Sequence, residues 1–332
     1  MLKFRGFALS SLAFAGAFCF SACGLVNSAR SVRPANQQVY VAYAGSLQWL
    51  NDRYLGPGFH KATGISYRGQ GGGSYGMAHL VSNKTIDANV FESIGTGPLK
   101  VLGSQVHYAI GVASSPLVIA YSPSSPYVKT LNAIRRGQLP LRRLFMLMAR
   151  PGFHLGRTNP ATDPQGQAFY MMIQSAQRRL GLKPGTANQV LGSLENPHQI
   201  FAEESILSQL QAGQLDASSA FLSEAVQRHL DYIPLPNGLN FGDPADAKRY
   251  SRLHLTLASG KIVHGALLEV YVAPLAHSFD SSAANRFVAY VLSKAGLDQF
   301  KAEGFRVTRP MILGRRSAMA PAIRQELGQA RG

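Results

Sequence analysis

The stretch RGQGGGSYG at residues 68–76 contains three patterns, each typical of a different chemistry. Three of its glycines have the G-x-G-x-x-G spacing of a dinucleotide-binding turn. Ser74 stands at the centre of a G-x-S-x-G sequence, which is typical of the nucleophile turn of a serine hydrolase. A third interpretation makes Ser74 the first residue of a helix whose unpaired N–H groups bind an anion.

The dinucleotide and hydrolase interpretations each have some support along the chain. A predicted strand precedes the glycines, a helix follows them, and Glu92 stands roughly 20 residues on, where such folds place a ribose-binding acid. A hydrolase needs an acid and then a histidine after its serine. Asp231 could supply the acid, and His254, His264 or His277 could supply the base. Against these two interpretations, the helix after the glycines is short and no HGGG-type oxyanion motif precedes the serine.

The anion interpretation uses a second turn of the same kind. Ser46 follows the alternating segment QVYVAYAG, and we expect it to cap the helix that begins there. A helix N-terminus has unpaired backbone N–H groups and the positive end of the helix dipole. Glycine at 45 and at 71–73 lets the backbone approach a ligand closely. Two such termini would bind one oxyanion through neutral donors, although both serines could equally be ordinary N-caps.

Predicted strands alternate with predicted helices, which is the pattern of an α/β fold with parallel sheets covered by helices. Extended segments are expected at QVYVAYAG, GISYRGQ, DANVFES, YAIGVASSPLVIAYSP and GALLEVYVAPLA. Helices are expected near residues 127–136, 141–148 and 165–180. Gly56-Pro57-Gly58 is expected to interrupt the first helix of the chain.

Two chain crossings, near residues 117–121 and 264–270, would divide the fold into two lobes. The first crossing lies inside YAIGVASSPLVIAYSP, which is expected to pass from one lobe to the other as a single strand. Ligands of open α/β sheets bind beyond the carboxyl ends of the strands. The turns at Ser46, Ser74, 163–166 and Ser223 are all expected at such ends.

The N-terminus has the features of an export signal. Lys3 and Arg5 precede an apolar run that is too short and too close to the terminus for a membrane span. The run ends in FSACG, which resembles the lipobox of bacterial lipoproteins and makes Cys23 the lipidated residue. Residues 24–37 are expected to form a tether. Because Cys19 and Cys23 are the only cysteines, the folded part has no disulfide and no thiolate metal site. An exported protein also has little access to NAD.

Composition points to a compact protein with a strongly basic balance. The chain has 332 residues, 46% of them hydrophobic, and a formal net charge of +16. A basic balance occurs in nucleic-acid-binding proteins, but no contiguous basic tract or aromatic-interleaved groove is present, so no nucleic-acid partner is expected. The arginines gather between Arg135 and Arg157, and we expect them to form a solvated basic face that attracts small anions through its long-range field.

Segments along nearly the whole mature chain resemble the tungstate/molybdate-binding proteins of ABC importers, which are periplasmic solute-binding proteins. The resemblance runs in order through VYVAYAGSL, RGQGGGSYGMAHLV, DANVFES, GTGPLKVL, LGRTNPATDPQGQAFYMMI, QLQAGQLDASSAFLSEAVQRHLDYIPLP and ANRFVAYVLSKAGLDQFKAEGF. Its most specific motif is G-R-[TS]-[ND]-P-x-x-D-P-x-G, present here as GRTNPATDPQG.

This resemblance implies a two-lobed type II periplasmic-binding-protein-like fold. Lobe 1 would consist of residues 38–118 and 268–315, and lobe 2 of residues 119–267, after a signal peptide at 1–23. The protein would be a lipid-anchored monomer of the periplasm or cell surface, with no catalytic activity and no cofactor. It would close on tungstate or molybdate and deliver the anion to an ABC permease in the inner membrane.

The resemblance also implies which residues bind the anion. The serine of A-G-S and the serine after the glycine cluster match Ser46 and Ser74, and D-P-x-G matches Asp163 and Gly166. Binding of another oxyanion such as sulfate or phosphate is the first alternative, and a secreted serine hydrolase that uses Ser74 is the second.

One departure from the family concerns the segment around Ser223. Some archaeal members have a glutamate before an aromatic residue there and hold the metal octahedrally with two carboxylates. Here Ala220 takes that place before Phe221, and the nearest acid is Glu224. Ser223 and Glu224 complete the expected ligand-binding residues, although they could be only a cap and a helix-start acid. A carboxylate beside a dianion is repulsive unless it ligates the metal or is protonated.

Overall fold

The computed structural model describes residues 37–329, except for the side chain of residue 204. Cys23, the predicted signal peptide and nearly all of the predicted tether lie outside the described residues. The described chain belongs to one compact unit. Within residues 37–329, no helix combines the length and the apolar character needed to cross a bilayer.

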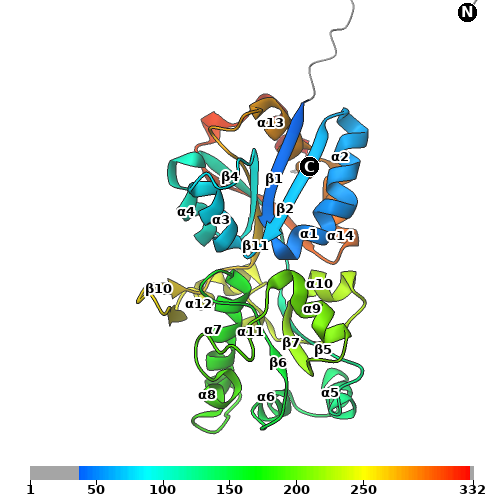
Figure 1. Cartoon of the computed structure of the whole chain (residues 1–332), viewed down its shortest axis with the longest axis vertical. Coiled ribbons are helices and arrows are strands. Elements are labelled where there is room, and N and C mark those ends of the chain that lie inside the picture. Colours follow the sequence, from blue (N-terminus) through cyan, green and yellow to red (C-terminus); the bar gives the residue numbers. More distant parts are fainter. Residues whose placement is uncertain (1–36, 330–332) are drawn as a thin grey trace, which may run out of the picture. The chain divides into compact units, whose positions relative to one another are not determined.

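A six-stranded sheet organises the first lobe, in the upper half of Figure 1. Its order is β12-β4-β11-β3-β1-β2. The strands are β1 (Gln38–Ala44), β2 (Ser66–Gly72), β3 (Val90–Ile94), β4 (Tyr108–Ser114), β11 (Glu269–Pro274) and β12 (Arg306–Gly314). The expectation of a parallel sheet is right for β1, β2 and β3. It is wrong for the other half, because β11 pairs antiparallel with β3 and β4, and β12 pairs antiparallel with β4.

Helices cover both faces of this sheet. Successive side chains of a strand point to opposite faces, and in β1 Tyr40 and Ala42 pack with Met77 of α3, whereas Val39 and Val41 belong to the core that contains Phe59 of α2. The helices of this lobe are η1 (Gly45–Leu47), α1 (Gln48–Leu50), η2 (Asn51–Leu55), α2 (Gly56–Thr63), α3 (Ser74–Ser82), α4 (Gly97–Leu102), η3 (Gly103–Gln105), α13 (Ser281–Leu292), α14 (Lys294–Ala302), η5 (Arg316–Ala318) and α15 (Pro321–Gln329).

The helical segment after Ser46 is longer than expected. Residues 48–63 run through α1, the π-helical turn η2 and α2 without a break. Gly56-Pro57-Gly58 therefore does not interrupt this segment, contrary to the prediction. Pro57 has no N–H to donate to the preceding turn, and it lies in the first turn of α2, directly after the π-helical turn η2.

A four-stranded sheet with the order β6-β7-β5-β8 organises the second lobe. Its strands are β5 (Leu117–Tyr121), β6 (Leu155–Gly156), β7 (Ala217–Phe221) and β8 (Asp231–Pro234), and a separate hairpin consists of β9 (His254–Thr256) and β10 (Ile262–His264). Its helices are α5 (Val128–Arg135), α6 (Arg142–Met148), α7 (Pro164–Arg179), α8 (Thr186–Leu191), α9 (Glu203–Gln211), α10 (Leu222–Gln227), α11 (Asn237–Asn240), η4 (Pro244–Asp246) and α12 (Ala247–Tyr250). Only β6 and β7 pair in parallel.

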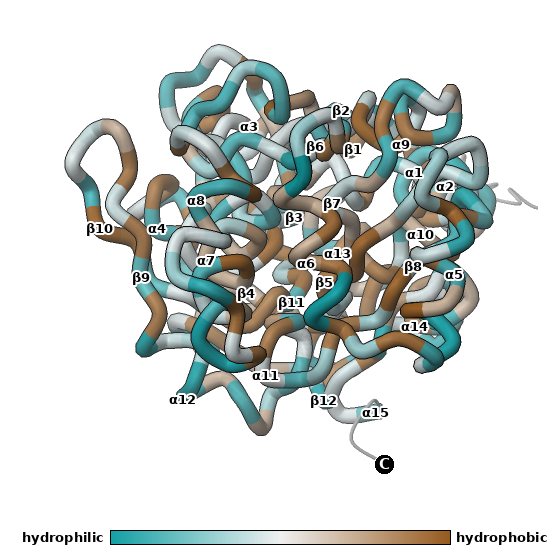
Figure 2. The backbone as a smooth tube through the Cα atoms, turned by 90° about the horizontal axis from the view of Figure 1, so that it is seen from below, coloured by the Kyte–Doolittle hydropathy of each residue, from teal (hydrophilic) through white to brown (hydrophobic). Residues whose placement is uncertain are grey.

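The chain passes between the two sheets at Ser115-Pro116 and again at residues 265–268. YAIGVASSPLVIAYSP is therefore two strands, β4 and β5, rather than one. Pro116 has no N–H to donate to a ladder, so the strand ends where the lobe changes. Figure 2 shows that hydrophobic segments gather around the central strands, while hydrophilic segments follow the outer loops.

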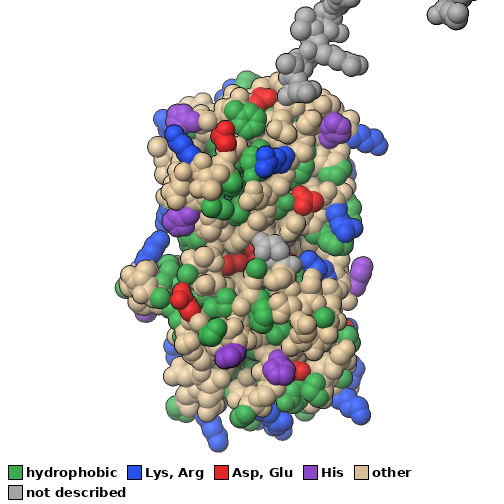
Figure 3. All heavy atoms as spheres, in the orientation of Figure 1, with side chains coloured by type: hydrophobic (Ala, Val, Ile, Leu, Met, Phe, Trp, Pro, Cys, Tyr) green, Lys and Arg blue, Asp and Glu red, His purple; other side chains and the backbone are tan. Residues whose placement is uncertain are grey.

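Arg157 does not belong to a solvated basic face, contrary to the prediction. Its side chain is fully buried. Its Nε donates to Gln199 Oε1 at 3.0 Å, and its guanidinium also donates to the carbonyls of Ser193 and Leu194. Burial lowers the pKa of Arg157 to about 10, and the side chain holds the 193–199 loop in place. On the face shown in Figure 3, lysines and arginines are spread around the edge rather than gathered in one patch.

Candidate functional site

Ser46 lies in the turn that follows β1. The turn η1 has Ala44 as its N-cap and no side-chain cap, so the prediction that Ser46 caps a helix is wrong. Only 3% of Ser46 is exposed, and its Oγ has no hydrogen-bond partner among the described residues. Ser46 borders a cavity of about 510 Å³. A buried hydroxyl without a partner costs roughly 1–3 kcal/mol, which makes Ser46 a candidate donor to a ligand.

The buried carboxyl of Glu92 supports this turn through Asn51. Asn51 Nδ2 donates to the carbonyl of Leu47 at 3.3 Å and to Glu92 Oε2 at 2.6 Å. Glu92 is fully buried, and that burial raises its pKa to about 7. Glu92 is therefore a structural support for the Ser46 turn, and it is not placed to bind the ribose of a dinucleotide.

Ser74 is the first residue of α3, as the anion interpretation requires. Gly73 is the N-cap and no side chain caps the helix, so neither serine is an ordinary N-cap. Ser74 is 1% exposed, and its Oγ accepts a hydrogen bond from the N–H of Ile94 at 3.2 Å. A hydroxyl that accepts one bond still has its hydrogen to donate.

The structure does not assemble the hydrolase triad. Asp231 bonds Arg135 at the surface of the second lobe. His254 and His264 are exposed on the β9–β10 hairpin. A buried Ser74 that is engaged with β3 is not presented as a nucleophile.

A loop of the second lobe closes over the start of α3. The carbonyl of Thr162 accepts hydrogen bonds from the N–H groups of Tyr75 at 3.0 Å and Gly76 at 3.3 Å. A Cβ added at Gly73 would lie 2.8 Å from that carbonyl oxygen and 3.5 Å from the Cβ of Asp163. Only glycine allows this approach, and the approach brings Asp163 to the Ser74 turn.

Gln165 connects the two carboxyl groups of the site. Asp163 caps α7, with Oδ1 accepting from the N–H of Gln165 at 2.6 Å. The Gln165 side chain donates to Glu224 Oε2 at 3.1 Å and accepts from Ser219 Oγ at 2.7 Å. Sequence reasoning missed Gln165, which occupies the variable position of D-P-x-G. Gly166 has a backbone role, since a Cβ there would lie 2.5 Å from the carbonyl oxygen of Thr158.

Glu224 is a buried acid at the start of α10. Its Oε2 accepts from the N–H of Phe221, the N-cap residue of α10, at 2.7 Å. Burial raises the pKa of Glu224 to about 8; the Phe221 hydrogen bond opposes this rise, whereas the charge of Asp163 adds to it. The carboxyl is therefore largely protonated at neutral pH, and it then adds no negative charge to the cavity.

The expected residues fall into three groups. Ser46 and Glu224 border the same cavity, one from each lobe. Asp163 lies beside the residue before Ser74, since a Cβ at Gly73 would be 3.5 Å from the Asp163 Cβ. Ser223 is engaged elsewhere: its Oγ accepts from Ser115 Oγ at 3.0 Å, and its N–H donates to that same oxygen at 3.0 Å, at the crossing between lobes.

The cavity beside Ser46 also has features that the motifs did not indicate. Trp49, Arg53 and Arg228 border it. The guanidinium carbon of Arg53 lies 3.8 Å above the Trp49 ring. Only the fold shows these three side chains together, because they come from two lobes.

Residues 39–306, most of the chain, match the family model described as bacterial extracellular solute-binding protein. The chain belongs to this family. A putative ABC transporter molybdenum-binding protein of Haloferax volcanii is 28% identical to this solute-binding protein over 278 residues, which are 83% of this chain and 84% of that one. The molybdate/tungstate-binding protein WtpA of Pyrococcus abyssi is 23% identical over 224 residues, 61% of this chain and 63% of WtpA.

The fold is similar to that of solved solute-binding proteins. The periplasmic molybdate-binding protein of Azotobacter vinelandii has a TM-score of 0.57 at 17% identity, covering 81% of this chain and 99% of that one. The sulfate-binding protein SubI of Mycobacterium tuberculosis has a TM-score of 0.53 at 12% identity, covering 88% and 91%. The expected two-lobed α/β fold and the family resemblance are confirmed, and a family of solute-binding proteins agrees with the expectation that the chain is no enzyme.

Proposed function

We propose that this solute-binding protein captures a tetrahedral oxyanion, tungstate or molybdate, and delivers it to the permease of an ABC importer. The observation that carries the proposal is the buried hydroxyl of Ser46, which has no partner among the described residues and belongs to a residue that borders a cavity lined by both lobes. The Haloferax and Pyrococcus relatives, named for molybdenum, molybdate and tungstate, support this choice of anion.

The proposed donors are neutral hydroxyls, because Ser46 and Ser74 can each donate an O–H. The Tyr75 and Gly76 N–H groups of α3 already bond the Thr162 carbonyl, and the Gln165 N–H of α7 bonds Asp163. Hydrogen bonds to a charged acceptor are roughly twice as strong as bonds between neutral groups. Arg53 and Arg228 border the same cavity, where Asp52 and Glu203 supply two acidic side chains as well.

The remaining parts of the proposal concern motion and location. The lobe boundaries near residues 118 and 268 are hinges, and the Thr162–Tyr75 contact belongs to the closed form. Lipidation of Cys23 anchors the protein at the membrane surface beside its permease, in the periplasm or on the cell surface. Mass analysis of the protein extracted from membranes tests this: a diacylglyceryl-modified Cys23 at the new N-terminus supports it, and an unmodified N-terminus contradicts it.

Calorimetric titration of the purified protein with tungstate, molybdate, sulfate and phosphate tests the proposed ligand. Tungstate and molybdate should bind with one site per chain, each at least about a hundredfold more tightly than sulfate or phosphate, which corresponds to ~2.7 kcal/mol. Preferential binding of sulfate or phosphate would replace the proposed ligand with that anion. Absence of binding by all four anions would contradict the oxyanion proposal itself.

A further inference from the structure

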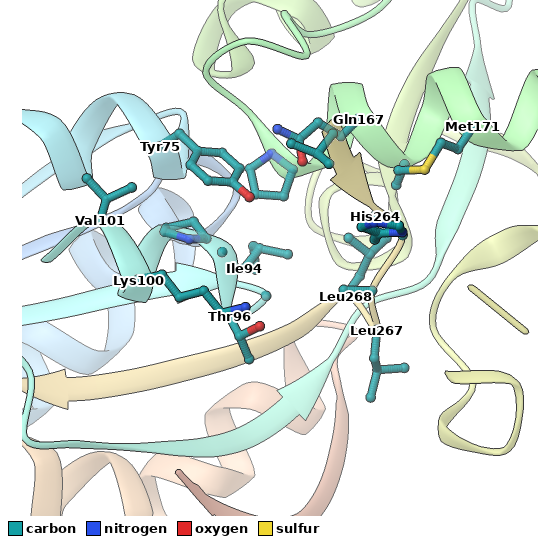
Figure 4. Close-up of a pocket in the computed structure, with 18 of the residues that line it drawn as sticks. Tyr75, Ile94, Thr96, Lys100, Val101, Gln167, Met171, His264, Leu267 and Leu268 are labelled. Carbon is teal, nitrogen blue, oxygen red and sulfur yellow. The ribbon is translucent and has the colours of Figure 1, made fainter. Parts of the chain in front are cut away.

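A second cavity, of about 470 Å³, is bordered by Tyr75, whose N–H donates to the Thr162 carbonyl. It shares no lining residue with the Ser46 cavity. Its walls come from α3 and α4 of the first lobe and from α7 and the β9–β10 hairpin of the second lobe (Figure 4). Its volume is within the range of roughly 300–1,000 Å³ that is usual for small-molecule sites.

The charged side chains of this second cavity are all basic. Lys100 and Lys261 line it from opposite lobes, together with His264, and no Asp or Glu is among its lining residues. The Nζ of Lys261 lies 5.9 Å from the centre of the Tyr75 ring. A cavity whose charges have one sign attracts ligands of the other sign, so its ligand is an anion.

The rest of the wall is apolar and aromatic. Tyr75 projects into the cavity near the Gln167 side chain (Figure 4). Val101 and Leu267, both partly exposed, line the same space beside the buried Met171. A small inorganic oxyanion would leave these surfaces without a partner, whereas a ligand with an apolar body would cover them.

We infer that this second cavity binds a small organic anion, in which a carboxylate or phosphate group meets Lys100 and Lys261 and an aromatic or aliphatic body packs against Tyr75 and Met171. Such a ligand touches both lobes and the returning segment at residues 266–268. It therefore binds the closed form better than an open one, and this difference stabilises closure. Positive coupling to tungstate follows by linkage, and this part alone rests on the proposed function.

Phenyl phosphate and benzoate are suitable probes because each combines a ring with one anionic group. Titration of the mature protein, followed by calorimetry, should give one site for at least one of the two probes. Benzyl alcohol, which lacks the charge, and inorganic phosphate, which lacks the ring, should each bind at least about tenfold more weakly. Absence of binding by both probes at millimolar concentration would overturn the inference, as would inorganic phosphate binding as tightly as phenyl phosphate.

For whichever probe binds, Lys100→Gln and Lys261→Gln should each lower the affinity by about tenfold, equivalent to ~1.4 kcal/mol. Lys129→Gln, an exposed lysine of α5 outside the cavity, should have no effect. Equal weakening by all three changes would show that the effect comes from net charge alone, and it would contradict the proposed site.

Tungstate then separates the second cavity from the oxyanion site. Direct tungstate titrations of the two lysine variants should match wild type, and the saturating probe should tighten tungstate binding. Competition between probe and tungstate would place the probe in the Ser46 cavity and overturn the inference. Absence of tungstate binding without the probe would contradict the proposed function, whereas the lysine-dependent probe site would still stand.

Discussion

The carbonyl oxygen of Thr162 accepts a hydrogen bond from the backbone N–H of Tyr75 at 3.0 Å. This bond joins a loop of the second lobe to the first turn of α3 in the first lobe. The N–H groups at the start of a helix have no partner within the helix, so the loop satisfies donors that would otherwise face the space between the lobes. The contact places Asp163 beside the Ser74 turn.

Gly73→Ala should prevent this contact. A Cβ there would lie 2.8 Å from the Thr162 oxygen, a clash with backbone that no rotamer change relieves. We expect tungstate affinity to fall by about tenfold or more. Small-angle scattering should show that tungstate reduces the radius of gyration of the wild type but not of the variant. Gly76→Ala is the matched control, because its Cβ would lie 3.9 Å from the nearest atom of Thr162. Equal behaviour of the two variants would contradict a role for this contact in closure.

Glu224 makes tungstate affinity depend on pH. Its pKa is raised to about 8, chiefly by burial, so the carboxyl loses its proton as the pH rises through that value. The new negative charge repels a bound dianion, and affinity should fall between pH 7 and pH 9. Glu224→Gln should remove this fall. A variant that keeps the wild-type pH profile would show that another group is responsible.

Protonation of Glu224 also makes the folding stability depend on pH. Burial raises the pKa of Glu224 in the folded protein to about 8, whereas the pKa of this carboxyl in the unfolded chain is about 4.5. Protonation therefore stabilises the fold fully below pH 4.5, and this stabilisation is lost as the pH rises toward 8. Denaturant unfolding should show a smaller decline in stability across this window for Glu224→Gln than for wild type; equal declines would mean that Glu224 is not buried with its proton.

Trp49 should report the ligand directly. It is the single tryptophan of the chain and borders the Ser46 cavity beneath the Arg53 guanidinium. An anion that draws Arg53 toward it changes the surroundings of the indole, so tungstate should produce a saturable change in tryptophan emission. The midpoint should agree with calorimetry. Binding by calorimetry without any change in emission would place the anion away from this cavity.

The positions of the two serines could be predicted because local signals specify them. An alternating strand, glycines and a helix start occur at both Ser46 and Ser74, and the structure places each serine where a strand of the first-lobe sheet ends. The side chains' partners could not be predicted. Ser46 borders a cavity that residues of both lobes line, and the Ser74 hydroxyl bonds the N–H of Ile94. The second-lobe lining residues and Ile94 are distant from the two serines in the sequence.

The sheet order and the role of Gln165 also depend on long-range contacts. Alternation of strands and helices predicts parallel pairing, but β11 returns from the second lobe and enters the first sheet antiparallel between β3 and β4. Gln165 contacts Glu224 and Ser219 only because α7 and the β7–α10 turn are neighbours in space. Composition alone places Arg157 at the surface. Its side chain is buried instead, because residues 193–199, distant in the sequence, supply its hydrogen-bond partners.

Calorimetric titration of Ser46→Ala with tungstate tests the central claim most directly. Ser218→Ala is a matched control, because Ser218 also has a buried hydroxyl without a partner but lies in β7, outside the Ser46 cavity. If the Ser46 hydroxyl donates to the anion, its removal should weaken binding by about 1.5–3 kcal/mol, roughly ten- to a hundredfold. Folding stability should be retained, because no protein hydrogen bond of that hydroxyl is lost. Ser218→Ala should bind tungstate like wild type, and wild-type affinity in Ser46→Ala would contradict the oxyanion site.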